Sequence, residues 1–214
     1  MKLHWSPRSP FVRKVMIVAH EAGLLERITC VRTVAAMIKP HQELMRDNPL
    51  SKIPTLVLDD GTALYDSAVI CEYLDELHDG PKLFPAALGA RMTALRRQAL
   101  GDGLLDILVL WRSEISRPTE LRWRTLQDSF AARTDAALAA LEREASELET
   151  SAFSIGHIAI GCALSYLDFR FAEREWRPGR PRLARWHAGF LARPSVRATE
   201  PLDDSDHPIG HASA

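Results

Sequence analysis

The chain has 214 residues, enough for one large domain or for two smaller domains with cores of their own. Apolar residues make up 46% of the sequence and charged residues 26%, as in ordinary soluble globular proteins. The formal net charge of −1 argues against a nucleic-acid partner or an anionic membrane, and no apolar stretch is long enough to span a bilayer.

The chain opens with alternating strand and helix signals. A short strand at Leu3–Trp5 precedes a helix over Pro10–Ala22, which has proline in its first turn and Gly23 just past its end. A β-branched strand at Ile28–Val34 and a short helix or turn at Pro40–Arg46 follow. These signals predict the first half of a small α/β unit.

A hairpin and a third helix complete this unit. The runs Thr55–Leu58 and Thr62–Leu64 flank Asp60-Gly61, a dipeptide that supplies the positive φ of tight hairpins. Asp66-Ser67 then caps a helix with apolar residues on one side: Val69, Ile70, Tyr73, Leu74 and Leu77. The order β-α-β-α-β-β-α over residues 1–79 predicts a compact domain with a mixed sheet.

A Gly- and Pro-punctuated linker over residues 80–86 separates this domain from a helical one at residues 87–200. The expected helices are Ala86–Glu114, Pro118 to about Glu149, Ile155–Phe171, Pro181–Ala192 and Ser195–Glu200. The third of these is apolar nearly all round, which predicts a position at the centre of the core. The tail at 201–214 has little to bury, and we expect it to be mobile.

The cysteines and histidines indicate neither a disulfide framework nor a metal site. Cys30, Cys71 and Cys162 are far apart, without a CxxC pair, and predict three buried thiols in a reducing cytoplasm. The first residues lack the apolar core of a signal peptide. The histidines show no ligand spacing, and the acidic tail Asp203–His207 could at most hold a cation weakly. We therefore expect no metal.

Three segments of the first domain carry groups that suit a ligand. Pro54 at a strand start leaves Ile53 extended, with a backbone that can pair with an extended peptide, particularly if the Ile53–Pro54 bond is cis. Ser9 precedes a helix whose N–H groups face outward, and Asp66-Ser67 opens another that suits a carboxylate and an ammonium group. Each alone resembles an ordinary cap or strand start, but together on one frame they favour peptide binding.

Three motifs resemble those of the glutathione transferases, especially a bacterial group that begins Ser-Pro-Phe-Val-Arg-Lys. They are Ser-Pro-Phe-Val-Arg-Lys-Val at 9–15, Asn-Pro-Leu-Ser-Lys-Ile-Pro-Thr-Leu at 48–56 and Asp-Ser-Ala-Val-Ile-Cys-Glu-Tyr-Leu at 66–74. Asp102-Gly103-Leu104-Leu105-Asp106 and Ile158–Arg170 are similar to bacterial members. The resemblance, over about residues 1–200, implies a thioredoxin-like N-terminal domain and an all-helical C-terminal domain.

The resemblance also implies a function. A cytoplasmic homodimer would conjugate glutathione to small electrophiles, typically in detoxification, with glutathione as co-substrate and no tightly bound cofactor. Two alternatives remain at this stage. One is a glutathione-dependent isomerase, dehalogenase or peroxidase. The other is a non-catalytic protein of the same fold that binds protein partners, although the intact Lys52-Ile53-Pro54 and Asp66-Ser67 argue against it.

Roles in glutathione binding follow from the resemblance, position by position. Ile53 resembles the residue whose backbone pairs with the cysteinyl part, and Pro54 matches the family's cis-proline. Asp66 and Ser67 match the acidic-Ser pair that holds the γ-glutamyl end, where many relatives have Glu rather than Asp. Lys52 resembles a contributor to binding of the glycine carboxylate, although a solvated lysine is an equal alternative.

The resemblance assigns the catalytic hydroxyl to Ser9, with Ser6 as a rival in the same loop. A hydroxyl that donates to the glutathione sulfur favours the thiolate, which is the attacking form. Because this position holds Ser and not Cys, a mixed disulfide with the enzyme is unavailable there. Trp5, Trp111 and Ile115 are candidates for the electrophile pocket by position only, and Trp111 is equally a candidate for the core.

One departure from the family concerns the start of the core helix of the second domain, Ser154-Ile155-Gly156-His157. Many relatives have a Ser/Thr-x-x-Asp capping box here, and His157 takes the place of the acid. We expect Ser154 to cap the helix still, but the reciprocal bond to its own N–H to be weakened or lost. A structural role for His157 is favoured over a catalytic one.

Overall fold

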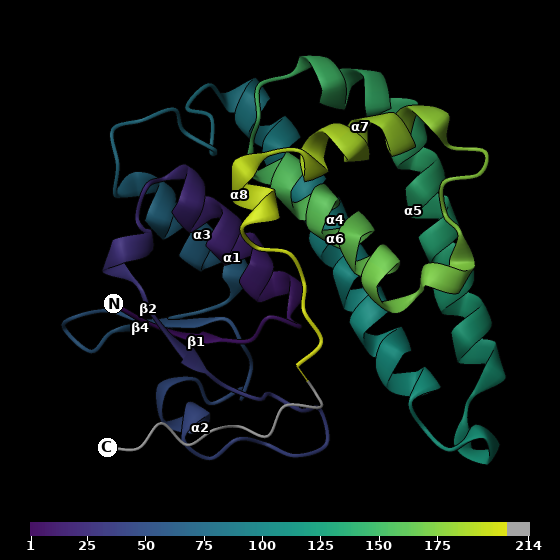
Figure 1. Cartoon of the computed structure of the whole chain (residues 1–214), viewed down its shortest axis with the longest axis horizontal. Coiled ribbons are helices and arrows are strands. Elements are labelled where there is room, and N and C mark those ends of the chain that lie inside the picture. Colours follow the sequence, from purple (N-terminus) through teal and green to yellow (C-terminus); the bar gives the residue numbers. More distant parts are fainter. Residues whose placement is uncertain (205–214) are drawn as a thin grey trace.

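A four-stranded mixed sheet forms the first part of the molecule in the computed structural model, which describes residues 1–204 (Figure 1). The strands are β1 (Lys2–Trp5), β2 (Thr29–Arg32), β3 (Thr55–Val57) and β4 (Ala63–Leu64), in the order β2-β1-β3-β4. β1 runs parallel to β2 and antiparallel to β3, which forms the predicted hairpin with β4. Gly61, at φ +88°, supplies the expected positive φ of the turn.

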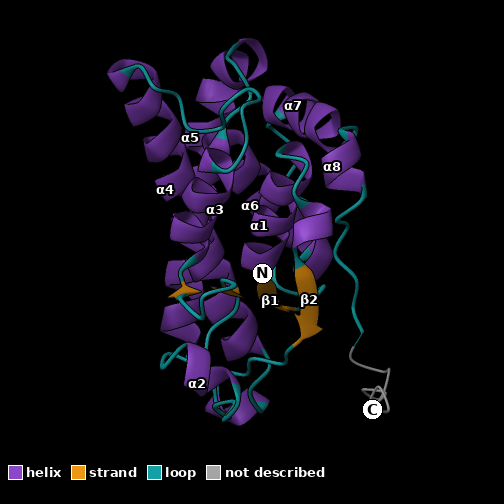
Figure 2. Cartoon of the chain, turned by 90° about the vertical axis from the view of Figure 1, so that its left-hand side faces the viewer, coloured by secondary structure: helices purple, strands orange, loops and turns teal. Residues whose placement is uncertain are grey.

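Helices cover both faces of this sheet. α1 (Pro10–Glu21) and α3 (Ser67–Glu76) pack together on one face, whereas α2 (Leu44–Asp47) lies on the other side (Figure 2). The core between the sheet and the two long helices is fully buried and includes Leu3, Val15, Leu56, Ile70 and Leu74. With the 3-10 turn Leu25–Arg27, the element order confirms the thioredoxin-like first domain.

Two residues of this domain lie outside the core that the sequence predicts for them. Cys30 is exposed because it lies on the edge strand β2, where neighbouring residues also face solvent. Val69, expected on the apolar side of its helix, is 48% exposed. Cys71 and Cys162 are buried as predicted, and burial raises the pKa of their thiols to about 12 and about 11.

The second part is all helical, as predicted. It consists of α4 (Leu88–Ile115), α5 (Arg124–Thr150), α6 (Ile155–Arg170), α7 (Pro181–Leu191) and α8 (Pro194–Arg197), with 3-10 turns at Thr119–Leu121 and Ala172–Arg174. α6 is central, since every residue from Ile155 to Leu167 is buried. α4 packs closely on α6 at Gly101, where a Cβ atom would lie 2.5 Å from the carbonyl carbon of Ala159. Only glycine allows this backbone approach.

The start of α5 differs from the prediction. The helix begins at Arg124 and not at Pro118, because the intervening chain forms a separate short turn that Glu114 holds. The Glu114 Oε1 atom accepts a hydrogen bond of 2.6 Å from the Trp123 N–H, immediately before the first helical residue. A contact between residues nine positions apart is not visible in helical periodicity.

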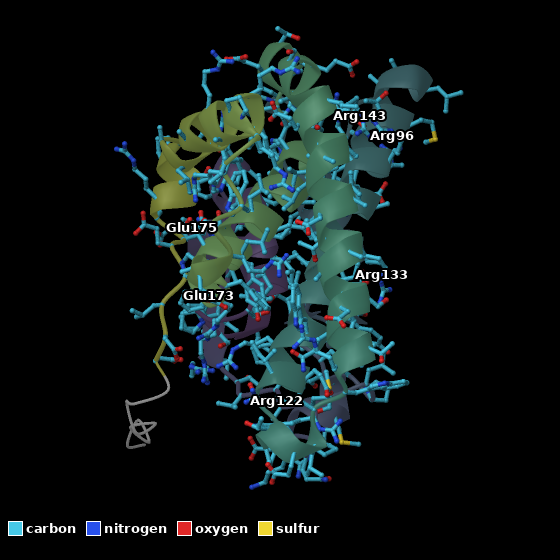
Figure 3. All side chains as sticks on the ribbon, turned by 90° about the vertical axis from the view of Figure 1, so that its right-hand side faces the viewer. Arg96, Arg122, Arg133, Arg143, Glu173 and Glu175 are labelled. Carbon is cyan, nitrogen blue, oxygen red and sulfur yellow. The ribbon has the colours of Figure 1, made fainter. Side chains whose placement is uncertain are left out.

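The outer face of α5 is a solvated charged surface. Figure 3 shows Arg133 and Arg143 along this helix, and both are exposed. The Arg96 guanidinium group on α4 donates two hydrogen bonds to the Glu144 carboxylate on α5, at 2.9 and 2.7 Å. The ion pair between Arg96 and Glu144 therefore links α4 to α5 at the surface of the helical part.

The start of α6 overturns the expectation for its cap. The Ser154 N–H donates to Nδ1 of His157 at 3.1 Å, so that the imidazole replaces the acid of the capping box. With Nδ1 as acceptor, the ring carries its proton on Nε2, which donates to the Leu148 carbonyl at 3.1 Å. Burial lowers the pKa of His157 to about 4, which keeps the ring neutral.

The C-terminal segment Pro201–Asp204 is held against the first part of the molecule. The Leu202 N–H donates to the Pro7 carbonyl at 3.3 Å, and Asp204 pairs with Arg8 and Arg32. The segment buries little, as expected, with Leu202 61% exposed, but these contacts hold it in place. Residues 205–214, including the rest of the acidic run to His207, lie outside the described residues.

Candidate functional site

The first predicted segment is the loop between β1 and α1, which ends at Ser9. The Ser9 Oγ atom accepts a hydrogen bond of 3.3 Å from the Val12 N–H and caps α1. Because Oγ only accepts in this contact, its hydrogen remains available to a ligand. Ser6 differs from Ser9, since its side chain is buried and its Oγ lies 3.4 Å from the Arg8 N–H.

The second segment is the loop that leads into β3. The Ile53–Pro54 bond is cis, and within residues 1–204 neither the N–H nor the C=O of Ile53 has a backbone hydrogen-bond partner. Buried Asn48 fixes this loop through Nδ2, which donates to the Lys52 carbonyl at 3.1 Å and to Thr55 Oγ1 at 3.0 Å. Lys52 itself is exposed. The loop thus leaves the main-chain N–H and C=O of Ile53 available to a ligand.

The third segment is the N-terminus of α3. Exposed Asp66 is the N-cap, and its Oδ1 accepts a 2.9 Å hydrogen bond from the Ala68 N–H. Ser67 is 4% exposed, and its Oγ has no hydrogen-bond partner in the described part of the chain. The Tyr65–Asp66 bond is also cis. A hydroxyl, a carboxylate and free helix N–H groups therefore meet at one point.

Helix α4 adds two carboxylates to which the sequence analysis gave no role. Asp102 accepts two hydrogen bonds of 2.7 Å from the buried Lys14 Nζ, which joins α1 to α4. The pKa of Asp106 is raised, first by partial burial and next by Asp102, while Lys52 acts in the opposite direction. The spacing of four residues on one helix face is the signal that could have identified the pair.

None of the candidates for the electrophile pocket lines the narrow crevice next to Ser9. Trp111 is 6% exposed and packs in the helical core, with ring centroids 5.1 Å from Phe171 and 6.3 Å from Phe130. Trp5 and Ile115 are half-buried against the core. A narrow crevice of about 10 Å³ does lie at Ser9, and its lining residues are Pro7, Arg8, Ser9, Pro10, Arg13, Cys162, Tyr166 and Pro201.

The site shows no arrangement for a metal. Among residues 1–204, no group of three or more His, Cys, Asp or Glu side chains lies close enough to hold a metal ion. None of the helices in this part of the chain is long and apolar enough to cross a membrane. Lys52, Asp66 and Asp102 all act electrostatically on Asp106, so the loop before β3 and the start of α3 lie near α4.

Two family models match the chain. The glutathione S-transferase N-terminal domain matches residues 8–77, and the glutathione S-transferase C-terminal domain matches residues 110–189. The uncharacterized GST-like protein YibF of Escherichia coli K12 is 30% identical over 203 residues, which cover 94% of this chain and 98% of YibF. The sequence match therefore extends through both parts of the molecule.

Solved structures agree with this match. A glutathione transferase family member from Pseudomonas fluorescens Pf-5 with bound glutathione has a TM-score of 0.91 and 43% identity, covering 94% of this chain and 98% of that one. A structure from the same organism with bound S-(propanoic acid)-glutathione has a TM-score of 0.87 and 42% identity, covering 94% of this chain and 100% of that one. This chain belongs to the glutathione S-transferase family.

Proposed function

We propose that this protein is a glutathione transferase that conjugates the thiolate of glutathione to a small electrophile. The observation that carries the proposal is the available main chain of Ile53, in a domain that also presents the Ser9 hydroxyl at the start of α1 and the Ser67 hydroxyl at the start of α3. An extended tripeptide that pairs with Ile53 has its sulfur towards one hydroxyl and its free amino-acid end towards the other. Relatives at 43% and 42% identity hold glutathione and a glutathione thioether.

Each part of glutathione has a complementary group. The γ-glutamyl carboxylate suits Ser67 and the N-terminus of α3, and its ammonium suits Asp66, with Asp106 close by on α4. The backbone of Ile53 suits the cysteinyl amide, next to cis-Pro54. Lys52 suits the glycine carboxylate. The protein needs no resident cofactor for this chemistry.

Ser9 supports activation of the thiol in preference to Ser6. Its hydroxyl hydrogen is available and it lies at the positive end of α1, whereas Ser6 is only 6% exposed. A hydrogen bond from Ser9 to the sulfur lowers the pKa of the glutathione thiol and increases its thiolate fraction. The thiolate then attacks carbon, a C–S bond forms, and the leaving group departs with the electron pair of the broken bond.

We also propose a homodimer in the cytoplasm. Four exposed apolar residues, Tyr65, Val69, Leu88 and Met92, lie on α3, on the turn before it and on the start of α4. An ion pair between Glu72 and Arg91 joins these two helices on the same side. Burial of this surface against a second copy explains why Val69 is not in the core. The three free cysteines suit a reducing compartment.

Thermal unfolding with millimolar glutathione tests binding, and turnover of aryl halides, epoxides, isothiocyanates and peroxides tests chemistry. We expect glutathione to raise the melting temperature and at least one alkylating probe to be consumed. Binding without turnover of any probe would indicate the non-catalytic alternative. No shift and no retention on a glutathione column would contradict the proposal. Light scattering of Val69→Glu should show a monomer where the unmodified protein is a dimer.

A further inference from the structure

Three arginines from three different elements converge on two consecutive aspartates of the C-terminal segment Pro201–Asp204. Arg8, in the loop before α1, places Nε 2.9 Å from Asp204 Oδ1. Arg32, at the end of β2, donates to the same carboxylate through Nε at 2.6 Å and Nη2 at 2.9 Å. Arg170, the last residue of α6, pairs with Asp203.

This cluster lies beside the candidate catalytic hydroxyl. Arg8 directly precedes Ser9, and both line the narrow crevice together with Tyr166 and Pro201. Figure 1 shows the C-terminal segment in yellow, descending from α8 past the loop between β1 and α1. The matched C-terminal family domain ends at residue 189, before this segment begins. Pro201, which lines the crevice, therefore lies outside the two matched domains.

The surroundings of the cluster are cationic. Arg13, one turn into α1, is 5% exposed, and within residues 1–204 its guanidinium group makes one hydrogen bond, from Nη2 to the Val196 carbonyl at 3.3 Å. Its Nε and Nη1 atoms have no partner in the described part of the chain. Among residues 1–204, the four guanidinium groups of Arg8, Arg13, Arg32 and Arg170 face three carboxylates that contact them or act on them electrostatically, those of Asp203, Asp204 and Glu200.

Guanidinium forks that hold a carboxylate from several directions form the geometry by which proteins bind small carboxylates. Here the occupants are the chain's own side chains, and the arginines remain partly exposed, at 28% for Arg8, 22% for Arg32 and 14% for Arg170. Because these ion pairs are partly exposed to solvent, each contributes little to stability. An external carboxylate that makes the same contacts can therefore displace them without leaving an arginine unpaired.

We propose that Arg8, Arg32 and Arg170 form a carboxylate site for the electrophile, which Asp203 and Asp204 occupy until an anionic electrophile displaces them. The inference rests on the proposed function and narrows it to small electrophiles that carry a carboxylate near the reactive carbon. With chloroacetate, the thiolate sulfur forms a bond to the methylene carbon, the C–Cl bond breaks, and chloride leaves with its electron pair. The carboxylate stays at the arginines throughout.

Two glutathione thioethers of nearly equal shape test the site without requiring turnover. S-carboxymethyl glutathione carries the carboxylate, and S-carbamidomethyl glutathione carries a neutral amide. Titration calorimetry of the full chain should show the carboxylate form binding about tenfold more tightly, as expected for charge-assisted hydrogen bonds. The ratio of the two affinities should fall towards one as salt is added, because salt screens the charged contact. The values of kcat/KM for chloroacetate and chloroacetamide, corrected for uncatalysed rates, should show the same preference for the carboxylate.

Variants identify the groups responsible. Arg8→Met should reduce the affinity ratio to about one, and Arg170→Met is the second variant if the first does not fold. Asp204→Asn should strengthen binding of the carboxylate form about threefold, because it weakens the internal competitor. The matched control Asp128→Asn, which changes an exposed pair with Arg124 on α5, should leave both affinities unchanged.

Three outcomes would overturn the inference. Equal affinities in the unmodified protein would show that no carboxylate site exists, and equal weakening of both ligands by Arg8→Met would show that the cluster only fixes the loop. The third is binding of glutathione and the amide form with rejection of the carboxylate form. Failure of all three ligands to bind would instead contradict the proposed function, and the inference with it.

Discussion

The N-termini of α1 and α3 differ from that of α6 in how their polar groups are satisfied. At α6, the Ser154 N–H is paired with His157, and the other nitrogen of that ring is paired with the Leu148 carbonyl. At α1 and α3, the Ser9 hydroxyl keeps an available hydrogen and the Ser67 hydroxyl has no partner within residues 1–204. Serine at the start of the helix therefore has its partners at α6, whereas at α1 and α3 its hydroxyl can still form a hydrogen bond with a ligand.

The difference follows from where each helix begins. α6 begins inside the helical core, where a buried polar group without a partner would cost about 1–3 kcal/mol. α1 begins after the central strand β1 and α3 after the edge strand β4. Ser67, which is 4% exposed like Ser154, is next to exposed Asp66, where a ligand can complete the bonds of its hydroxyl. We call the start of α6, where the polar groups are paired, a closed cap, and the starts of α1 and α3, where a serine hydroxyl can still bind a ligand, open caps. Closed caps should contribute to stability and open caps to binding and chemistry, and four predictions test this difference.

The largest effect is expected at the closed cap. His157→Ala removes the acceptor for the Ser154 N–H and the donor for the Leu148 carbonyl, and it leaves a cavity. We expect the free energy of unfolding to fall by about 3–4 kcal/mol, measured by urea denaturation. Glutathione affinity of the folded fraction should not change. A fall below about 1 kcal/mol would show that the imidazole does not hold this cap.

The same residue should make stability pH-dependent. Burial lowers the pKa of His157 to about 4 in the folded chain, against about 6.5 in the unfolded chain. Between these values the unfolded chain binds a proton that the folded chain does not, so stability is lost as the pH falls from 6.5 to 4. The loss should reach about 3 kcal/mol at the lower limit.

His157→Gln is the matched control for this titration, because glutamine can accept from the Ser154 N–H and does not titrate. The pH dependence that remains in this variant should come from other groups, including His187, whose pKa burial also lowers to about 4. Identical pH profiles for the variant and the unmodified protein would exclude His157 as the source.

The open cap of α1 should affect chemistry rather than folding. Ser9→Ala should lower kcat with a model electrophile about 30-fold, because a hydrogen bond to a charged sulfur contributes about 2 kcal/mol. The pKa of the bound glutathione thiol, measured from the absorbance of the thiolate, should rise. The affinity for glutathione should change less than about threefold. Ser6→Ala is the control, and a larger loss in that variant would move the assignment to Ser6.

The smallest effect is expected at the open cap of α3. Ser67→Ala should weaken glutathione binding about tenfold through the lost contact to the γ-glutamyl carboxylate, with little change in kcat once the site is saturated. Ser129→Ala on the exposed side of α5 is the matched control. A loss of stability larger than the loss of affinity would show that this hydroxyl serves the fold.

Several features could be predicted from the sequence because they depend on neighbouring residues. The hairpin at Asp60-Gly61, the caps at Ser9 and Asp66, and the buried α6 follow from turn geometry, cap chemistry and apolar periodicity. The motifs around Ile53-Pro54 also indicated the family correctly. The start of α5 could not be predicted in this way, because Glu114 sets it from the preceding helix.

The order of elements, the family and the candidate site residues could be inferred from the sequence, since local backbone preferences and short motifs carry that information. The burial of Trp111 in the core, the difference in exposure between Ser6 and Ser9, and the pairing of Asp204 with Arg8 and Arg32 were set by the folded structure. Those outcomes depend on contacts between residues far apart in the chain. Such contacts form only when packing brings separate elements together, and no spacing along the sequence encodes them.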